Sequence, residues 1–252
     1  MSGWIEAAAI RRRALSFGAR AELYDLVRPT YPPQVLDVLL ADLPPRQGPN
    51  RVIDAGAGTG KLTAVLAAGG WEVDAVEPDP GMRAVLAARL PRVRVHAGRG
   101  EQLLLPAASA DAVVYGQAWH WVEPAAGARE AARVLRPGGV LAMLWNYEDD
   151  RTGWVGELER IVGSQARNRP VPPDLPGFGA AQVSRSSWSR EQDVAALPDF
   201  VLSHSAVAIL PDQQRAEVLD AVRQLTIEHP DLRGRDHVEV PMQLDCWSYR
   251  RS

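Results

Sequence analysis

The sequence predicts an α/β fold, in which a mostly parallel sheet is flanked by helices, and three observations support this class. Between residues 51 and 145, short apolar segments alternate with segments whose apolar residues recur at helical spacing, the rhythm of βα units. The first apolar segment runs into a glycine-rich turn and then directly into a helical stripe. Polar residues follow several apolar segments, at the strand ends where open parallel sheets bind ligands.

Three helices are expected before the sheet. Residues 1–14 form a short amphipathic segment, and residues 16–27 form a second helix that closes before Arg28-Pro29. A third helix begins at Pro32-Pro33, because proline is favoured in the first helical turn. A loop rich in proline over residues 44–49 then leads to the first strand.

The central part of the chain carries the clearest pattern. Strands are expected at about residues 51–55, 73–77, 93–96, 111–116 and 139–145, with helices at about 61–68, 80–90 and 124–135. Local signals mark the helix ends: Gly69-Gly70 ends the first, Asp79-Pro80 starts the second, and Pro124 starts the third.

The last hundred residues are less regular. We expect helices near residues 152–166 and 212–227, a loop over 167–179, a strand around 181–188, and a helix near 191–203 that Pro198 interrupts. The alternation of Met242, Leu244 and Cys246 with polar residues predicts a half-buried final strand. Because Pro241 has no N–H to donate, either a bulge lies there or this strand begins after it.

Length, charge and cysteine content exclude several classes of protein. The 252 residues fit one large domain, and a net charge of −3 gives no overall basic field for nucleic acid. No uncharged stretch approaches a membrane span, and no targeting segment is recognisable. The single cysteine, Cys246, rules out an intramolecular disulfide framework, and the cysteine and histidines lack metal-ligand spacing. We therefore expect a soluble, cytoplasmic protein with no metal, membrane or nucleic-acid partner.

The glycine-rich turn indicates which ligand the sheet binds. A dinucleotide fingerprint reads G-x-G-x-x-G, whereas this turn reads Gly56-x-Gly58-x-Gly60 and follows Asp54. An acid at the mouth of the turn repels a pyrophosphate but suits a ligand that carries a sulfonium or ammonium. Glu77 ends the next strand roughly twenty residues later, where a carboxylate accepts hydrogen bonds from ribose hydroxyls. The turn thus favours S-adenosylmethionine (SAM) over NAD.

At these residues the sequence resembles the class I SAM-dependent methyltransferases. The resemblance covers about residues 50–146 and is carried by the turn, Glu77 and three further motifs in order: Gly98–Glu101, Asp111–Gln117 and Val134–Gly139. Phe17-Gly, Tyr24 and Arg28-Pro-Thr-Tyr31-Pro resemble the lead-in of a subgroup that acts mostly on small molecules. Beyond residue 147 the resemblance thins.

The resemblance implies a Rossmann-like methyltransferase sheet of seven strands, mostly parallel with the last one antiparallel. It implies one domain over residues 1–252, with an N-terminal helical lid (1–48), a cofactor-binding core (49–146), and cap helices and closing strands (147–252). The expected reaction transfers a methyl group from SAM to an oxygen, hydroxyl or carboxylate, of a metabolite or natural product, and leaves S-adenosylhomocysteine (SAH). Secondary metabolism and a monomer or homodimer are expected.

The family motifs also assign candidate residues. Met82 is expected against the adenine ring and Arg28 near the cofactor carboxylate, while Arg99 stands where related sequences often carry an acid or amide and cannot accept a hydrogen bond. Cofactor-binding residues are expected to be Arg28, Tyr31, Asp54, Gly56, Ala57, Gly58, Gly60, Glu77, Pro78, Met82, Gly100, Glu101 and Gln117. The acceptor is expected to contact Trp119, His120, Trp121 and Trp145.

His120 is the candidate catalytic base, because a histidine can take a proton from a hydroxyl near neutral pH. The alternative is an imidazole wedged between two indoles in a structural role. Three other functions stay open: a SAM-binding protein that assists a cyclisation or rearrangement, a nucleic-acid methyltransferase, and an NAD oxidoreductase. The second normally carries an Asn/Asp-Pro-Pro-aromatic motif after the fourth strand, where this chain has Gln117-Ala-Trp-His.

Overall fold

The computed structural model describes residues 21–41, 43, 47–151, 153–163 and 171–252. The helix expected at residues 1–14, the first part of the helix expected at 16–27, and Phe17 lie outside the described residues. So do residues 164–170, which the predictions divided between a helix and a loop.

The described residues form a seven-stranded sheet in the order β3-β2-β1-β4-β5-β7-β6. The first five strands run parallel, and β7 pairs antiparallel with both β5 and β6. This confirms the predicted fold class. The strands are β1 (Arg51–Ala55), β2 (Glu72–Glu77), β3 (Arg94–Ala97), β4 (Ala110–Gly116), β5 (Leu135–Glu148), β6 (Gln182–Asp193) and β7 (His237–Arg250).

The helices begin at the predicted caps. The Asp79 carboxylate accepts hydrogen bonds from the amides of Gly81 and Met82, at 2.8 and 3.0 Å, before Pro80 opens its helix. None of the described helices has the length and apolar composition to cross a bilayer. The helices are α2 (Ala21–Val27), α3 (Val35–Ala41), α4 (Lys61–Ala68), α5 (Pro80–Arg89), the 3₁₀ turn η2 (Trp119–Trp121), α6 (Pro124–Val134), α7 (Gly153–Val162), α8 (Leu197–Leu202), α9 (Ser205–Ala208) and α10 (Asp212–Glu228).

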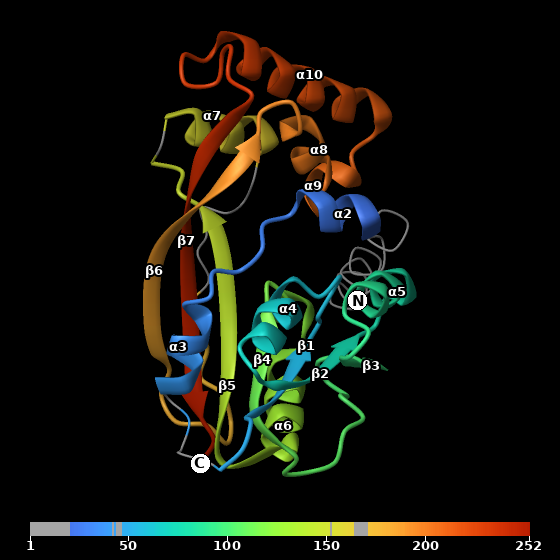
Figure 1. Ribbon diagram of the computed structural model, residues 1–252, viewed down its shortest axis with the longest axis vertical. Helices are drawn as coiled ribbons and strands as arrows, with labels where there is room; N and C mark the ends of the chain where they lie inside the picture. The colour runs from blue at the N-terminus through green and yellow to red at the C-terminus, as the bar shows by residue number, and fades with distance from the viewer. Residues whose placement is uncertain (1–20, 42, 44–46, 152, 164–170) are drawn as a thin grey trace, which may run out of the picture.

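Strand periodicity divides the core between the two faces of the sheet. Val52 and Val114 pack in one buried cluster with residues of α3 and α4. The alternate positions Ile53 and Val113 pack in a second cluster with residues of α6. Because successive side chains of a strand point to opposite faces, these continuously apolar strands require helices on both sides. Figure 1 shows the resulting three layers in the lower half of the molecule.

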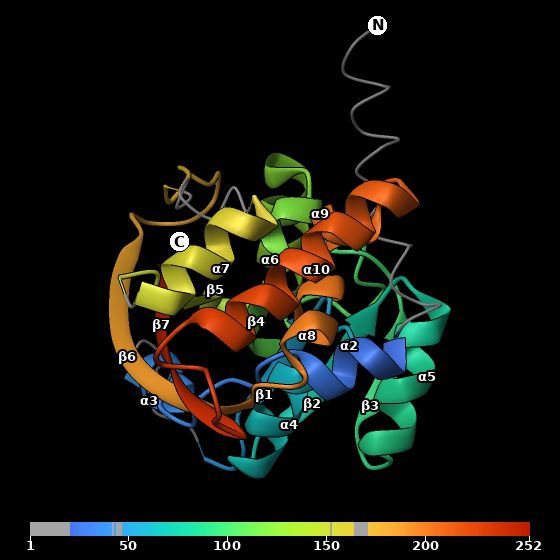
Figure 2. The same ribbon diagram turned by 90° about the horizontal axis from the view of Figure 1, so that it is seen from above.

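Strands β5, β7 and β6 extend well beyond the other four and carry a helical cap (Figure 1). A third cluster joins α7, α8 and α10 to the far ends of these strands through Trp154, Phe200, Val222 and Met242. Val27 of α2 belongs to the same cluster, and α2 also contacts α5. Figure 2 shows α7 and α10 side by side above the sheet, with α2 beneath α8. Helix α2 thus connects the cap to the core.

The predicted helix near residues 191–203 was wrong in its first part. Strand β6 continues through Asp193, which pairs with His237 of β7, and α8 begins only at Leu197. Pro198 lies in the first turn of α8, where a missing N–H removes no helical hydrogen bond. The proline starts this helix and does not interrupt one.

Neither expectation for Pro241 was right, because β7 runs through it without a shift in register. Pro241 pairs with Ser189 of β6, and its carbonyl accepts a 2.8 Å hydrogen bond from the amide of Asp149. The N–H and C=O of one strand residue point to the same side. The missing N–H therefore faces the end of β5, whose pairing with β7 stops at Glu148, so the ladder loses no hydrogen bond there.

One buried carboxylate stabilises the free edge of the parallel sheet. Asp74 of β2 is 1% exposed and accepts hydrogen bonds of 2.9, 2.8 and 2.9 Å from Arg51, Arg94 and His96. Burial raises the pKa of Asp74, but these hydrogen bonds outweigh it and lower the pKa to about 2. The depressed pKa means that this stabilisation is present above the ordinary aspartate range and is lost as the pH falls through about 2.

Replacing Asp74 with asparagine is therefore expected to lower the free energy of unfolding at pH 7 by about 1–2 kcal/mol. Urea unfolding at several pH values measures the effect, which should shrink toward zero near pH 2. Glu72→Gln is the control, since Glu72 is an exposed acid of the same strand and its loss should change the free energy by less than about 0.5 kcal/mol. A difference for Asp74→Asn that is independent of pH would contradict this account.

Candidate functional site

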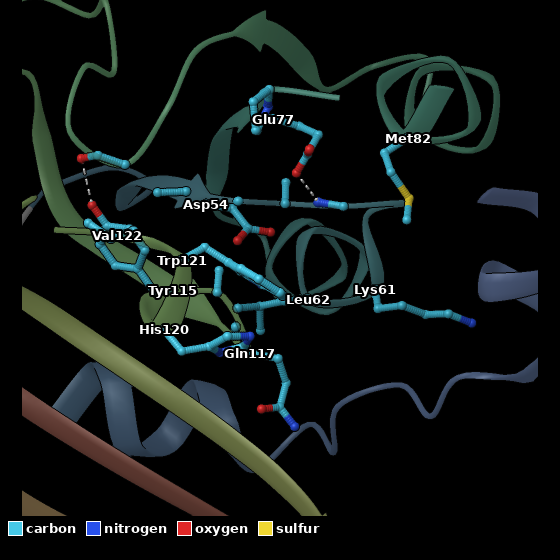
Figure 3. Close-up of a pocket in the computed structure, with 18 of the residues that line it drawn as sticks. Asp54, Lys61, Leu62, Glu77, Met82, Tyr115, Gln117, His120, Trp121 and Val122 are labelled. Atoms are coloured by element: carbon cyan, nitrogen blue, oxygen red, sulfur yellow. Dashed lines mark hydrogen bonds between the residues drawn. The ribbon is translucent and has the colours of Figure 1, made fainter. Parts of the chain in front are cut away.

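A cavity of about 1220 Å³ lies at the carboxyl ends of β1, β2 and β4, below the cap. Figure 3 shows the Asp54 carboxylate near its centre, with Glu77 and Met82 to one side and Gln117 and His120 to the other. The cavity brings together most of the residues that the sequence predicted: Arg28, Tyr31, Asp54, Gly56, Ala57, Gly58, Glu77, Pro78, Met82, Gly100, Glu101, Gln117, His120 and Trp121.

The glycine turn is fixed in a conformation that only glycine adopts without strain. Gly56 has φ 73°, and a Cβ on it would lie 2.6 Å from the Cβ of Ala118. The amides of Gly56 and Ala57 both donate to the carbonyl of Val76, at 2.8 and 3.1 Å, so the turn is tied to the end of β2. Gly58 has φ 57°, and a Cβ on it would have no other atom within 4 Å. No side chain therefore covers the backbone of Gly58 where it lines the cavity.

Glu77 ends β2 and is hydrogen-bonded to the glycine turn itself. Its carboxylate is 6% exposed and accepts one hydrogen bond from the amide of Gly58 (2.9 Å) and one from that of Asp79 (2.8 Å). Burial raises the pKa of Glu77, while the Asp79 and Gly58 amides act in the opposite direction. Two amides use only part of the acceptor capacity of a carboxylate, so Glu77 retains lone pairs for a ligand (Figure 3).

Asp54 is the most perturbed acid of the cavity. It is 1% exposed; Oδ2 accepts a 2.6 Å hydrogen bond from the Thr63 hydroxyl, while Oδ1 is buried without a partner. Burial raises the pKa of Asp54 to about 7; the Thr63 hydrogen bond opposes this rise and the Glu77 charge adds to it. A buried carboxylate with one unsatisfied oxygen is costly unless a donor or cation meets it.

The segment after β3 closes another side of the cavity. The Tyr115 hydroxyl donates to the carbonyl of Gly100 at 3.1 Å, and a Cβ on Gly100 would lie 2.6 Å from Val122 (Figure 3). The Glu101 carboxylate accepts a 3.0 Å hydrogen bond from the amide of Glu123, which opens α6. These contacts fix the backbone of the segment, while Arg99 contributes its side chain to the lining.

The segment after β4 is strained at its first residue. Gln117 has φ 53°, which is unfavourable for any residue other than glycine. Its backbone amide donates a 2.9 Å hydrogen bond to the carbonyl of Leu144. This turn directs η2 back under the cavity. The His120 ring packs against Trp121 and Trp145, with ring centres 4.4 and 5.6 Å away. His120 as a whole is an exposed residue whose free surface lines the cavity. The face of its ring that packs against these indoles is shielded from water, and this desolvation lowers the pKa of His120 to about 4.

Three predicted residues do not line the cavity. Gly60 caps α4, and a Cβ on it would meet Leu86 of α5 at 3.0 Å. Trp119 is buried in the core, edge-on to Tyr115 at 4.9 Å. Trp145 is buried behind His120, and its indole Nε1 has no hydrogen-bond partner. The two indoles that enclose His120 are thus Trp121 and Trp145.

Sequence reasoning missed two residues at the end of β5. Asn146 and Glu148 both line the cavity. The Asn146 amide group donates to the carbonyl of Thr30 and accepts from the Trp188 indole, each at 3.0 Å. The rule that ligands bind at strand ends could have identified them. The prediction ended this strand at Trp145, where the apolar run stops, but β5 continues to Glu148.

Ion pairs hold α2 over the mouth of the cavity. Asp25 lies 2.5 Å from Arg89 of α5 and 3.6 Å from Lys61 of α4, and Lys61 also donates to the Asp25 carbonyl. Lys61 is the only lysine of the chain. Burial lowers its pKa, and the Asp25 charge opposes this. No group of three acidic, histidine or cysteine side chains that could hold a metal occurs among the described residues.

Comparison with known proteins identifies the family. A family model described as a methyltransferase domain matches residues 53–143. An uncharacterized methyltransferase of Mycobacterium tuberculosis strain H37Rv is 42% identical over 239 residues, which cover 94% of this chain and 96% of that protein. A malonyl-[acyl-carrier protein] O-methyltransferase of Pectobacterium atrosepticum is 29% identical over 164 residues, covering 65% of this chain and 64% of that protein.

Among solved structures, a protein of Anaeromyxobacter dehalogenans assigned as a type II methyltransferase aligns with a TM-score of 0.62 and 24% identity. The alignment covers 89% of this chain and 97% of that one, and it shows the fold alone. The relative from M. tuberculosis, by contrast, matches in sequence over nearly its whole length. The chain therefore belongs to the class I SAM-dependent methyltransferase family.

Proposed function

We propose that this methyltransferase binds SAM in the cavity and transfers its methyl group to an oxygen of a small molecule. The observation that carries the proposal is the pairing of two buried acids across the bare glycine turn, Glu77 and the half-satisfied Asp54. Glu77 receives the two ribose hydroxyls, and the Asp54 carboxylate faces the positive methionine end. Met82 covers the adenine ring from α5. The sulfonium supplies an electrophilic methyl carbon.

The acceptor reacts at the side of the cavity lined by Gln117, His120 and Trp121. In the proposed reaction a bond would form between the acceptor oxygen and the methyl carbon while the carbon–sulfur bond breaks, and the electron pair of that bond would stay on sulfur. A carboxylate acceptor has no proton to lose, whereas a hydroxyl would release its proton to solvent. The protein aligns the two reactants and excludes water, which in favourable cases lowers a barrier by roughly 7–11 kcal/mol. An oxygen acceptor is consistent with the name of the Pectobacterium relative, an O-methyltransferase.

His120 positions the acceptor in this proposal. With its pKa lowered to about 4, the ring is neutral at physiological pH and is a poor base for a hydroxyl proton. A neutral imidazole still donates one hydrogen bond to an acceptor oxygen. Its packing against Trp121 and Trp145 fixes the direction of that bond.

Replacing His120 with alanine is accordingly expected to lower kcat by about tenfold, the effect of one lost hydrogen bond. His120→Asn retains a donor and should keep most of kcat, and the affinity for SAH should be unchanged in both variants. Initial rates with labelled SAM measure this. Equal losses of about a hundredfold or more in both variants would instead identify His120 as the catalytic base.

The proposal is tested by calorimetry on ligand-stripped protein titrated with SAM, SAH and NAD. Micromolar or tighter binding of SAM and SAH, and none of NAD, is expected. Incubation with labelled SAM and an extract of metabolites, followed by mass spectrometry, then finds the methylated product. Absence of SAM and SAH binding would remove the proposed activity, while binding without any labelled product would favour a non-methylating use of the cofactor.

A further inference from the structure

Two arginines that are 162 positions apart meet at the cap end of the cavity. Arg28 follows α2, and Arg190 lies in β6. Both guanidinium groups pack over the ring of Phe200 in α8, at 5.7 and 5.0 Å from its centre. Arg28 lines the cavity and donates a 3.1 Å hydrogen bond to the carbonyl of Ser203. In each arginine, Nε is buried and has no hydrogen-bond partner.

The positive charge of this arginine pair, Arg28 and Arg190, is only half compensated. Among the described residues, Glu148 is the one carboxylate within 4 Å of either guanidinium, 3.8 Å from Nη2 of Arg190. The side chains of Arg190 and Glu148 are 12% and 14% exposed. The nearby His204 adds no charge, because burial and the two arginines lower its pKa to about 3. Two cations and one anion leave a single positive charge in a sheltered site.

An uncompensated guanidinium that is sheltered from water is costly unless a ligand supplies the missing charge. The Nη groups of arginine donate charge-assisted hydrogen bonds to the oxygens of a carboxylate. A single residual positive charge suits a singly charged carboxylate better than a doubly charged phosphate. Arg28 and Glu148 line the same cavity as His120, so one ligand can reach Arg28 and His120 together. Arg190 does not line the cavity itself and acts on it through its charge and its 3.8 Å contact with Glu148.

We propose that Arg28 and Arg190 form a subsite for a carboxylate carried by the methyl acceptor, which anchors the acceptor while its reacting oxygen lies beside His120. This inference rests on the proposed methyltransferase function and names the class of its substrate. The methionine end of SAM also carries a carboxylate, and the sequence motifs place Arg28 near it. Saturating the protein with SAH fills that place, so a carboxylate that still binds must occupy a site of its own. The hydrogen bonds of the glycine turn run to Glu77 and Val76 and involve neither arginine.

The test uses the full chain saturated with SAH, so that the cofactor site is filled. Acetate, succinate and benzoate are compared with acetamide, succinamide and benzamide by thermal shift and calorimetry at constant ionic strength. Sodium phosphate and sodium chloride distinguish a carboxylate site from a general anion site. At least one carboxylate is expected to stabilise the complex, and its neutral amide, phosphate and chloride are not.

Variants locate the effect. Arg190→Gln is expected to lower the affinity for the carboxylate at least about tenfold, because a hydrogen bond to a charged group is lost, and to leave the affinity for SAH unchanged. Arg190→Lys keeps the charge but lacks the guanidinium group, and it should also lower the affinity for the carboxylate. This second variant keeps the test possible if Arg190→Gln does not fold. Arg185→Gln is the matched control. Arg185 lies in the same strand with its side chain 68% exposed, it pairs with Asp245 at 3.5 Å, and it does not line the cavity, so this variant should bind the carboxylate like wild type.

Three results would overturn the inference: no carboxylate stabilises the wild-type complex, phosphate stabilises it equally, or both Arg190 variants retain wild-type affinity for the carboxylate. A loss of SAH affinity in the Arg190 variants would also overturn it, by assigning the arginine pair to the cofactor. Failure of the wild-type protein to bind SAH at all is a separate outcome, since it removes the proposed function first.

Discussion

Replacing Glu77 with alanine is expected to weaken the binding of both SAM and SAH by at least about a hundredfold. A hydrogen bond to a charged group contributes about 1.5–3 kcal/mol, and the ribose offers two hydroxyls to this carboxylate. The change also removes the acceptor of the Gly58 and Asp79 amides, at 2.9 and 2.8 Å, and so loosens the glycine turn itself. Calorimetry with SAH at pH 8 gives the affinity directly.

The control for Glu77 separates the ribose contact from the support of the turn. Glu77→Gln keeps the volume and one oxygen acceptor but loses the charge and the second acceptor, so an intermediate loss of affinity is expected. Circular dichroism and thermal unfolding establish that each variant is folded. A folded Glu77→Ala variant with wild-type affinity for SAH would show that the ribose lies elsewhere.

Replacing Asp54 with asparagine is expected to lower the affinity for SAM by about 10–100-fold and the affinity for SAH by much less. The reason is charge: the sulfonium of SAM is positive, whereas the thioether of SAH is neutral, and only the former gains from the buried carboxylate. Thr63 can still donate to the amide oxygen, so the local hydrogen bond at Oδ2 is kept. Calorimetric titrations of both ligands into wild type and variant give the two ratios.

The pKa of Asp54 adds a pH dependence whose sign is fixed. In the free protein this carboxyl is protonated below about pH 7, and a bound cation favours the ionised form. Binding of SAM at pH 6 therefore releases a proton, and its affinity rises with pH up to about 7 and is then level. Calorimetric titrations in buffers with different ionisation enthalpies measure the number of protons that SAM binding releases. Equal pH slopes for SAM and SAH would contradict the assignment.

The same group opposes folding of the free protein. Because the pKa of Asp54 is raised in the fold from 3.8 to about 7, the stability that its proton provides is complete below about pH 4 and is lost as the pH rises through 7. At pH 8 the ligand-free Asp54→Asn variant should be more stable than wild type by about 2–4 kcal/mol. Urea unfolding tests this, and a less stable variant would contradict it.

Local sequence determined the part of the cavity that we propose for the cofactor. The turn from Asp54 to Gly60 and the acid at Glu77 were identified correctly as neighbours, because backbone conformation and strand ends are encoded by adjacent residues. The helix starts at Pro80 and Pro124 followed from caps that also act within one turn. The roles of these residues toward SAM stay predictions that the binding experiments decide.

Local patterns did not determine the cap. Strand β6 pairs with β7 across an insertion that contains α8, α9 and α10, and this register comes from packing between segments about fifty residues apart. The expected interruption at Pro198 and the expected break at Pro241 both treated proline by its local cost. In the fold each proline occupies a place where no N–H is needed. Pro198 lies in the first turn of α8, and Pro241 lies just beyond the point where the pairing of β5 with β7 stops.

The part of the cavity that we propose for the acceptor was decided by tertiary structure. Arg28 donates to Ser203, which is 175 positions away, and Trp188 donates to Asn146. The His120 ring of η2 packs against Trp145 of β5, while its neighbour Trp119 packs against Tyr115 instead. Contacts of this kind arise from many weak packing terms that no single segment contains. The sequence by itself therefore determined a glycine turn and its acid, and only the folded chain brought together the arginine pair and Glu148.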